Sequence, residues 1–233
     1  MCWMDKYARN QFLKLKDEYN ISTFVETGTF RGASARFYSF HFKEVLGCDI
    51  DENYINISRQ YTQDRNNVII EKTTSRDFLR NFVAQYYRDK REDIVFMFLD
   101  AHFYNPVLMP NERWVVVDEL KSLSNFKNCV ICIHDFDCSG LGHCCYEGEP
   151  LGFPLILPYM HWVNPDFHYY VNEKKFSSMI NEEEAKKLDE MILDENTIDT
   201  IQFANRTEVL RYRGYLYCTP TALDLSKYEL RRA

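Results

Sequence analysis

The sequence has 233 residues, a length that suits one α/β domain with a full core. Its net charge of −7 comes without a basic stripe, which argues against nucleic acid as a partner because phosphate neutralisation requires clustered lysines and arginines. The first residues do not resemble a signal peptide, and the apolar runs are too short to cross a bilayer. We therefore expect a cytoplasmic protein without a membrane partner.

The first 135 residues alternate strand-like and helix-like segments. The predicted strands cover residues 23–26, 44–49, 67–71, 94–99 and 128–133. The predicted helices cover residues 5–19, 33–42, 53–64, 75–88 and 111–123. Ser75 is the expected N-cap of the helix over 75–88. This alternation predicts a Rossmann-like, doubly wound α/β sheet that is mostly parallel and has right-handed crossovers.

Residues 136–180 interrupt the alternation with glycines, prolines and aromatic residues. We interpret this segment as an insertion that covers the site, where Trp162 and Tyr169 would stack on a bound acceptor; ordinary packing of a long loop is equally consistent. A helix over 181–194 and strands over 197–204 and 211–218 would then complete a seven-stranded sheet with a C-terminal antiparallel hairpin. Residues 1–233 are expected to form a single domain that begins with an N-terminal helix in residues 1–20, and a homo-oligomer is compatible with the sequence.

A glycine-containing turn follows the first predicted strand, and its sequence is Glu26-Thr27-Gly28-Thr29-Phe30-Arg31-Gly32. Glycine at position 28 lets the backbone turn tightly and approach a ligand closely. Phe30 and Arg31 break the Gly-x-Gly-x-x-Gly pattern of dinucleotide sites. The Glu26 carboxylate suits a ligand with a cationic group better than a pyrophosphate.

Polar residues also follow the second and third predicted strands. Asp49 is the expected acceptor for ribose hydroxyls, with Asp51 as a second choice. Thr74 and Ser75 are expected to contact the edge of the adenine ring.

Together these motifs resemble the class I S-adenosylmethionine-dependent methyltransferases. The resemblance covers about residues 21–135. It implies S-adenosylmethionine as the cofactor, bound by Glu26, Thr27, Gly28, Thr29, Gly32, Asp49, Thr74, Ser75 and Asp100.

Acidic and imidazole side chains follow the fourth and fifth predicted strands: Asp100 and His102 after one, His134 and Asp135 after the other. Neighbouring parallel strands bring these residues to one edge of the sheet. A sugar hydroxyl is a weak nucleophile that needs a base and gains from a cation. We expect Asp100, His134 and Asp135 to bind Mg²⁺ or Mn²⁺ and His102 to be the base, with Asp100 and Asp135 as catalytic carboxylates. Glu119 is expected on a solvated helix face.

This edge resembles that of the macrocin-type, metal-dependent sugar O-methyltransferases. Those enzymes have an Asp after the fourth strand, a basic residue two or three positions on, and an acidic pair after the fifth strand. Asp100, His102 and Asp135 match this scheme, whereas His134 stands where the family has an acid. The resemblance implies methyl transfer to a carbohydrate or another small-molecule acceptor. Two alternatives stay open: a metal-independent methyltransferase for another small molecule or a protein, and a non-catalytic nucleotide-binding module.

Overall fold

The computed structural model describes residues 6–101, 114–138, 145–146, 148–172 and 214–233, and its secondary structure follows the predicted alternation. The helices are α1 (Lys6–Glu18), α2 (Ala33–Tyr38), α3 (Glu52–Tyr61), α4 (Ser75–Arg88), α5 (Val115–Ser122), α6 (Phe153–Val163) and the 3₁₀ turn η3 (Leu225–Lys227). The strands are β1 (Thr23–Thr27), β2 (Glu44–Asp49), β3 (Val68–Lys72), β4 (Val95–Leu99), β5 (Cys129–His134), β6 (Cys145–Tyr146), β7 (Glu149–Pro150), β8 (His168–Asn172), β9 (Tyr215–Thr219) and β10 (Leu230–Arg232).

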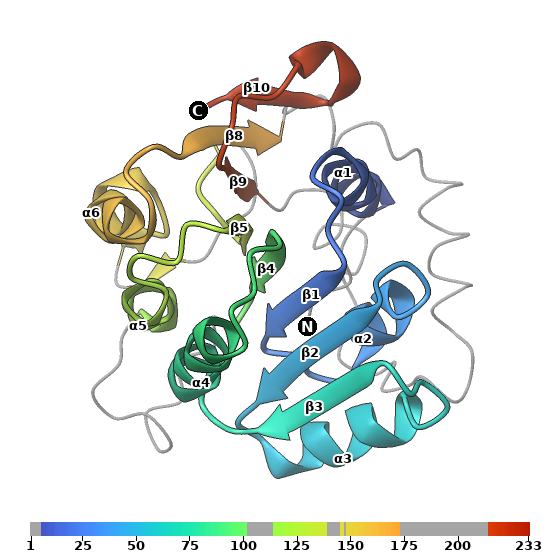
Figure 1. Ribbon diagram of the computed structural model, residues 1–233. Coiled ribbons are helices and arrows are strands. Elements are labelled where there is room, and N and C mark those ends of the chain that lie inside the picture. Colours follow the sequence, from blue (N-terminus) through green and yellow to red (C-terminus); the bar gives the residue numbers. More distant parts are fainter. Residues whose placement is uncertain (1–5, 102–113, 139–144, 147, 173–213) are drawn as a thin grey trace, which may run out of the picture.

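Eight of the strands form one sheet in the order β10-β8-β9-β5-β4-β1-β2-β3 (Figure 1). The five strands from β1 to β5 pair in parallel, whereas β9 pairs antiparallel with both β5 and β8. The order reverses at β1, which has β2 on one side and β4 on the other, and ligands of such sheets bind at this switch point. The predicted Rossmann-like, mostly parallel fold is therefore confirmed.

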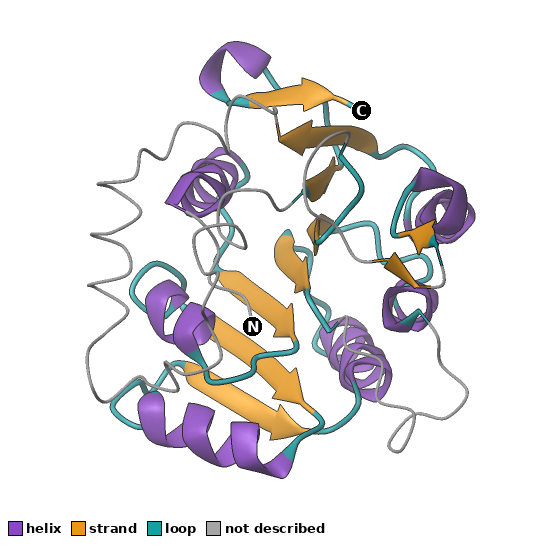
Figure 2. Ribbon diagram, turned by 180° about the vertical axis from the view of Figure 1, so that it is seen from behind, coloured by secondary structure: helices purple, strands orange, loops and turns teal. Residues whose placement is uncertain are grey.

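Helices cover both faces of the sheet because the buried strands direct alternate side chains to opposite sides. Phe24 and Phe96 pack with α1, α2 and α3, while Val25 and Met97 pack with α4, α5 and α6. Figures 1 and 2 show the two helical layers from opposite sides. Because helices pack on both faces of the sheet, we expect a ligand at the carboxyl ends of the strands.

The N-cap of α4 is Thr74, and the prediction of Ser75 was wrong by one residue. The Thr74 hydroxyl accepts a hydrogen bond of 3.1 Å from the backbone N–H of Asp77, and Thr74 has the extended backbone of an N-cap. Ser75 is the first helical residue and is buried. The cap fixes where the chain turns from β3 into α4, next to the strand ends.

We expect Thr74→Ala to lower the free energy of unfolding by about 1 kcal/mol, because one backbone N–H of the first turn loses its acceptor. Urea unfolding of the wild type, Thr74→Ala and Thr74→Ser measures the loss. The serine variant keeps the acceptor oxygen and should remain close to the wild type. Equal losses in the two variants would contradict the capping role.

The segment predicted as a covering insertion contributes instead to the main fold. It contains α6, which packs against α5, and β8, which pairs with β9 inside the sheet. Pro154 and Pro158 lie within α6 and interrupt the sequence pattern of a helix. The described sheet consequently has eight strands instead of seven, and β8 lies between β9 and β10. The predicted helix over 181–194 and strand over 197–204 lie outside the described residues.

Within the described part of the chain, no helix combines the length and apolar character that crossing a membrane requires.

Candidate active site

The turn between β1 and α2 packs directly against the end of β4. Gly28 has a φ of 71°, and a Cβ atom there would lie 2.9 Å from the backbone oxygen of Asp100. Gly32 has a φ of 81°, and its Cβ atom would lie 2.9 Å from Cβ of Ser58 in α3. Any other residue at these positions would strain the backbone and clash with its neighbour. Gly28 thus lets the turn pack against the end of β4, and Gly32 lets it pack against α3.

Asp49 connects this turn to the end of β2. Its Oδ2 accepts the backbone N–H of Phe30 at 2.9 Å, and its Oδ1 accepts that of Asp51 at 2.9 Å. Burial raises the pKa of Asp49 although these N–H groups oppose the shift. Asp51, the second choice for the ribose, caps α3 by accepting the N–H of Asn53 at 2.7 Å. Asp49 is therefore the better placed of the two carboxylates.

Glu26 lies at the end of β1 with only 1% of its surface exposed. Its Oε2 accepts a hydrogen bond of 2.5 Å from the Ser34 hydroxyl, and its Oε1 has no hydrogen-bond partner among the described residues. Burial raises the pKa of Glu26 to about 8, and the Ser34 hydroxyl only partly opposes this shift. Thr29 lies beside Glu26, in the space left by the absent side chain of Gly47. Ionisation of this buried carboxyl group is therefore unfavourable, and a cationic ligand beside it would make ionisation easier.

Asp100, His134 and Asp135 come together at the ends of β4 and β5, as predicted. Nδ1 of His134 lies 3.0 Å from Oδ1 of Asp100 and 3.1 Å from Oδ1 of Asp135. At least 90% of each of the three side chains is buried. Asp135 has a φ of 56°, a left-handed conformation that is uncommon outside glycine and is frequent at functional sites. His102, the predicted base, lies outside the described residues.

The arrangement of these three residues does not fit a resident Mg²⁺ or Mn²⁺ ion. Both carboxylates converge on one imidazole nitrogen at hydrogen-bond distance, not on a shared cation position. In the described ranges, no group of three or more His, Cys, Asp or Glu side chains is arranged to hold a metal ion.

Glu119 was predicted on a solvated face, and this was wrong. The residue is fully buried, and burial raises its pKa to about 7. The hydroxyls of Thr27 and Ser75 oppose this shift of the pKa only in part, and neither carboxyl oxygen of Glu119 has a hydrogen-bond partner among the described residues. The sequence carries a signal for this burial, because Glu119 lies on the same helical stripe as Val116 and Leu120.

Two further residues complete the edge beside His134, and neither was predicted. The Tyr215 ring meets the imidazole edge-to-face with centroids 4.9 Å apart. Asn172 is buried at the end of β8, and its Oδ1 accepts the backbone N–H of Tyr215 at 2.8 Å. Asn172 escaped prediction because β8 was interpreted as part of an insertion, whereas Tyr215 lies on the strand predicted over 211–218, to which no role in the site was given.

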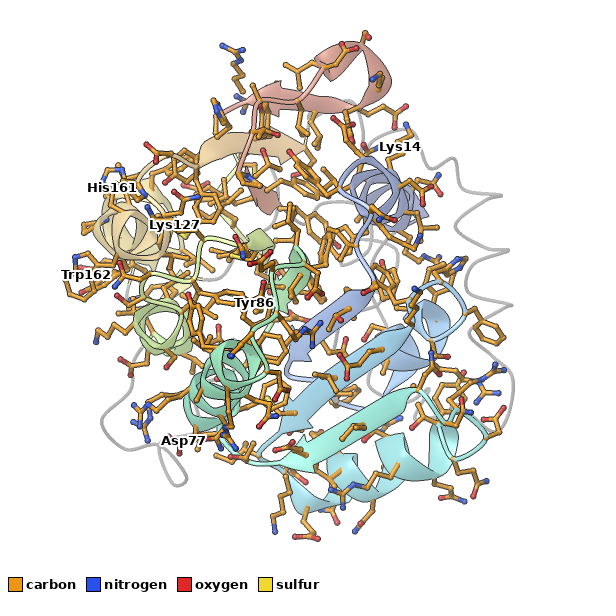
Figure 3. All side chains as sticks on the ribbon, viewed as in Figure 1. Lys14, Asp77, Tyr86, Lys127, His161 and Trp162 are labelled. Carbon is orange, nitrogen blue, oxygen red and sulfur yellow. The ribbon has the colours of Figure 1, made fainter. Side chains whose placement is uncertain are left out.

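The structure does not bring Trp162 and Tyr169 to this edge. Trp162 is 52% exposed and points outward from α6 (Figure 3). Its carbonyl accepts the backbone N–H of Asn125, just before β5 and thus at the opposite end of that strand from His134. Tyr169 packs its ring edge-to-face against Phe153 within the core beside α6. The prediction that these two aromatic side chains bind the acceptor does not fit this placement.

No protein-family model matches the chain, and no curated protein matches its sequence. The solved structures to which the chain is similar include an S-adenosylmethionine-dependent methyltransferase from Anabaena variabilis and an rRNA methylase from Streptococcus thermophilus. The plantazolicin methyltransferase BamL, solved with S-adenosylhomocysteine (SAH), is 18% identical over 91% of this chain and 83% of its own, with a TM-score of 0.48. The [4+2]-cyclase SpnF is 10% identical over 95% of this chain and 89% of its own, with a TM-score of 0.50. The spermidine synthase from Thermotoga maritima is 12% identical over 96% of this chain and 63% of its own, with a TM-score of 0.51. What the similarity to SpnF and the spermidine synthase establishes is the fold alone: the chain shares their Rossmann-like α/β fold.

Proposed function

We propose that this protein is an S-adenosylmethionine-dependent O-methyltransferase that acts on a sugar hydroxyl of a glycan or a small-molecule glycoside. One observation carries the proposal. The turn over residues 26–32 packs on the end of β4, so a cofactor held by the turn lies next to Asp100, His134 and Asp135. A carboxylate-rich edge suits a polyhydroxylated acceptor, because carboxylates accept hydrogen bonds from hydroxyl groups.

The strand ends supply a group for each part of S-adenosylmethionine. The Glu26 carboxyl group, with Oε1 available, is placed to receive the ammonium group of the methionine part. Each Asp49 oxygen accepts one backbone N–H and retains acceptor capacity for the ribose hydroxyls. Thr74 and Ser75 begin α4 where the adenine edge would lie.

The chemistry needs one proton acceptor. The hydroxyl oxygen of the sugar attacks the sulfonium methyl group, and the bond between that methyl carbon and the sulfur breaks. The hydroxyl proton passes to a base, and the products are a methyl ether and SAH. His134 is the described imidazole at this edge, and donation from Nδ1 to a carboxylate places the lone pair of the neutral ring on Nε2. Asp100 and Asp135 would orient the ring and stabilise its charged form.

Calorimetry with SAH, followed by transfer from labelled S-adenosylmethionine to a panel of glycosides and phenols, tests this function. We expect SAH to bind and glycosides to be methylated. Failure of the wild type to bind SAH would overturn the function, and methylation of phenols alone would overturn the acceptor class.

The same assay distinguishes metal-independent from metal-dependent transfer. The convergence of Asp100 and Asp135 on His134 favours the metal-independent alternative, so we expect transfer to survive exhaustive chelation. Loss of transfer on chelation and its recovery with Mg²⁺ or Mn²⁺ would restore the metal-dependent mechanism.

A further inference from the structure

Asn172 holds the first residue of β9 at the edge of the sheet that carries the candidate site. Its side chain is buried, and its Oδ1 accepts the backbone N–H of Tyr215 at 2.8 Å. The register of β8 and β9 ends with the pair Val171 and Leu216, so this side-chain bond continues the pairing by one residue. The Cys138 sulfur lies 3.6 Å from the same Oδ1 and 3.6 Å from the carbonyl oxygen of Tyr215. Asn172 and Cys138 thus contact both backbone polar groups of Tyr215.

The position of Tyr215 matters because its ring packs on the proposed base. Tyr215 is the register partner of His134 in the antiparallel pair β5–β9, and the two rings meet edge-to-face with centroids 4.9 Å apart. Tyr215 begins β9, and the terminal residues of a strand open more easily than the central ones. The bond from Asn172 opposes such opening and therefore influences where the Tyr215 ring lies against the imidazole.

The His134 imidazole has an aromatic ring beside it from each neighbouring strand. Phe98 of β4 lies 6.2 Å away between centroids, and Tyr215 of β9 lies on the other neighbour of β5. A histidine ring has only a broad preference for its second side-chain torsion, so its neighbours decide how it is turned. In the observed orientation Nδ1 lies 3.0 Å from Oδ1 of Asp100, and turning the ring over would bring a carbon atom there instead. The flanking rings oppose that rotation.

We propose that Asn172 is a positioning residue for methyl transfer: it holds Tyr215 so that the Tyr215 ring keeps the His134 imidazole in the orientation that a base requires. The inference deepens the proposed function and rests on it, since His134 acts as a base only if the protein transfers methyl groups. Asn172 acts through Tyr215 and is given no contact with the cofactor or the acceptor.

Single-turnover transfer from saturating S-adenosylmethionine tests the inference. Asn172→Leu keeps the approximate size of the side chain but removes the acceptor oxygen. We expect it to slow transfer about 10–10²-fold, as a small misplacement of a catalytic group does. In a His134→Gln background no imidazole is left to position, so Asn172→Leu should cause no further loss there.

Asn164→Leu is the matched control. Asn164 is also buried, precedes β8 at its other end, and accepts the backbone N–H of Asp166 on Oδ1 at 3.0 Å. Loss of this bond should lower the melting temperature about as much as Asn172→Leu does, but it should leave transfer at the wild-type rate. Equal losses of transfer in the two variants would make the role of Asn172 purely structural.

The NMR spectrum of protein with labelled histidine side chains gives a readout that needs no methyl transfer. The His134 resonance is identified by its absence from the spectrum of His134→Gln, and the ring current of Tyr215 shifts it. In Asn172→Leu this resonance should move towards its position in Tyr215→Leu. In Asn164→Leu it should stay in place.

These results separate the positioning role from the proposed function. If the His134 resonance does not move in Asn172→Leu, the positioning role is wrong. The role is also wrong if Asn172→Leu slows transfer as much in the His134→Gln background as in the wild type. If the resonance moves as expected but wild-type protein transfers no methyl group, Asn172 positions the imidazole and the proposed function fails.

Discussion

Replacing His134 with glutamine is expected to lower kcat for methyl transfer by about 10²–10⁴-fold, the usual contribution of a positioned general base. Nδ1 of the imidazole lies 3.0 Å from Oδ1 of Asp100 and 3.1 Å from Oδ1 of Asp135. Glutamine has a similar reach but cannot take up the hydroxyl proton. Single-turnover transfer from saturating S-adenosylmethionine measures the chemical step, and SAH calorimetry should give a Kd close to that of the wild type.

Two variants sharpen this result. Asp135→Asn should also reduce transfer while SAH still binds, and asparagine is preferable to alanine because it tolerates the left-handed φ of 56° at this position. His161→Gln is the matched control, because His161 is exposed on α6 and points away from the sheet (Figure 3). Activity of His134→Gln within tenfold of the wild type would remove His134 as the base and direct the same test to His102.

Much of the fold follows from the sequence because buried strands have a simple signature. Val95–Leu99 is a continuous apolar run, and the structure buries every residue in it. The meeting of Asp100 with Asp135 could also be predicted, since neighbouring parallel strands deliver the residues after them to one edge. These inferences depend only on strand order and direction.

Other features require information that local sequence does not contain. Trp162 follows the site residues along the chain, but whether it lies near them depends on which end of α6 faces the strand ends. Pro158 lies inside α6 and hid that helix. Glu119 was predicted to be exposed to solvent because of its residue type, although its spacing from Val116 and Leu120 indicated burial. A charged residue on an apolar stripe is thus better interpreted as a candidate functional group than as a solvated one.

Glu26→Gln is expected to stabilise the ligand-free protein as the pH rises. The pKa of Glu26 is about 8 in the folded protein because of burial, against 4.5 for an ordinary glutamate. Between these values the folded state holds a proton that the unfolded state has released, so the free energy of unfolding of the wild type falls as the pH rises. Glutamine cannot ionise, and above pH 8 the variant should therefore be the more stable by about 3–5 kcal/mol.

Urea unfolding of wild type and Glu26→Gln at intervals from pH 5 to pH 9 measures this difference. The gap should be small near pH 5, widen towards pH 8 and then level off. Glu71→Gln is the control, because Glu71 is exposed on β3 and its replacement should leave stability unchanged throughout. A gap that does not change with pH would mean that the folded protein does not hold the Glu26 proton.

The same substitution should weaken SAH binding, so stability and affinity are expected to change in opposite directions. Ionisation of the buried carboxyl group is unfavourable without ligand, but it becomes favourable once a cationic ammonium group pairs with the carboxylate. Glutamine offers no charge for that pair. Binding to the wild type at pH 7 should release a proton from Glu26, which calorimetry detects as heats that depend on the ionisation enthalpy of the buffer. Glu26→Gln should show less of this dependence. A variant that gained stability and kept full affinity would show that Glu26 is buried for a reason other than the cofactor, and the ammonium group would then need another partner.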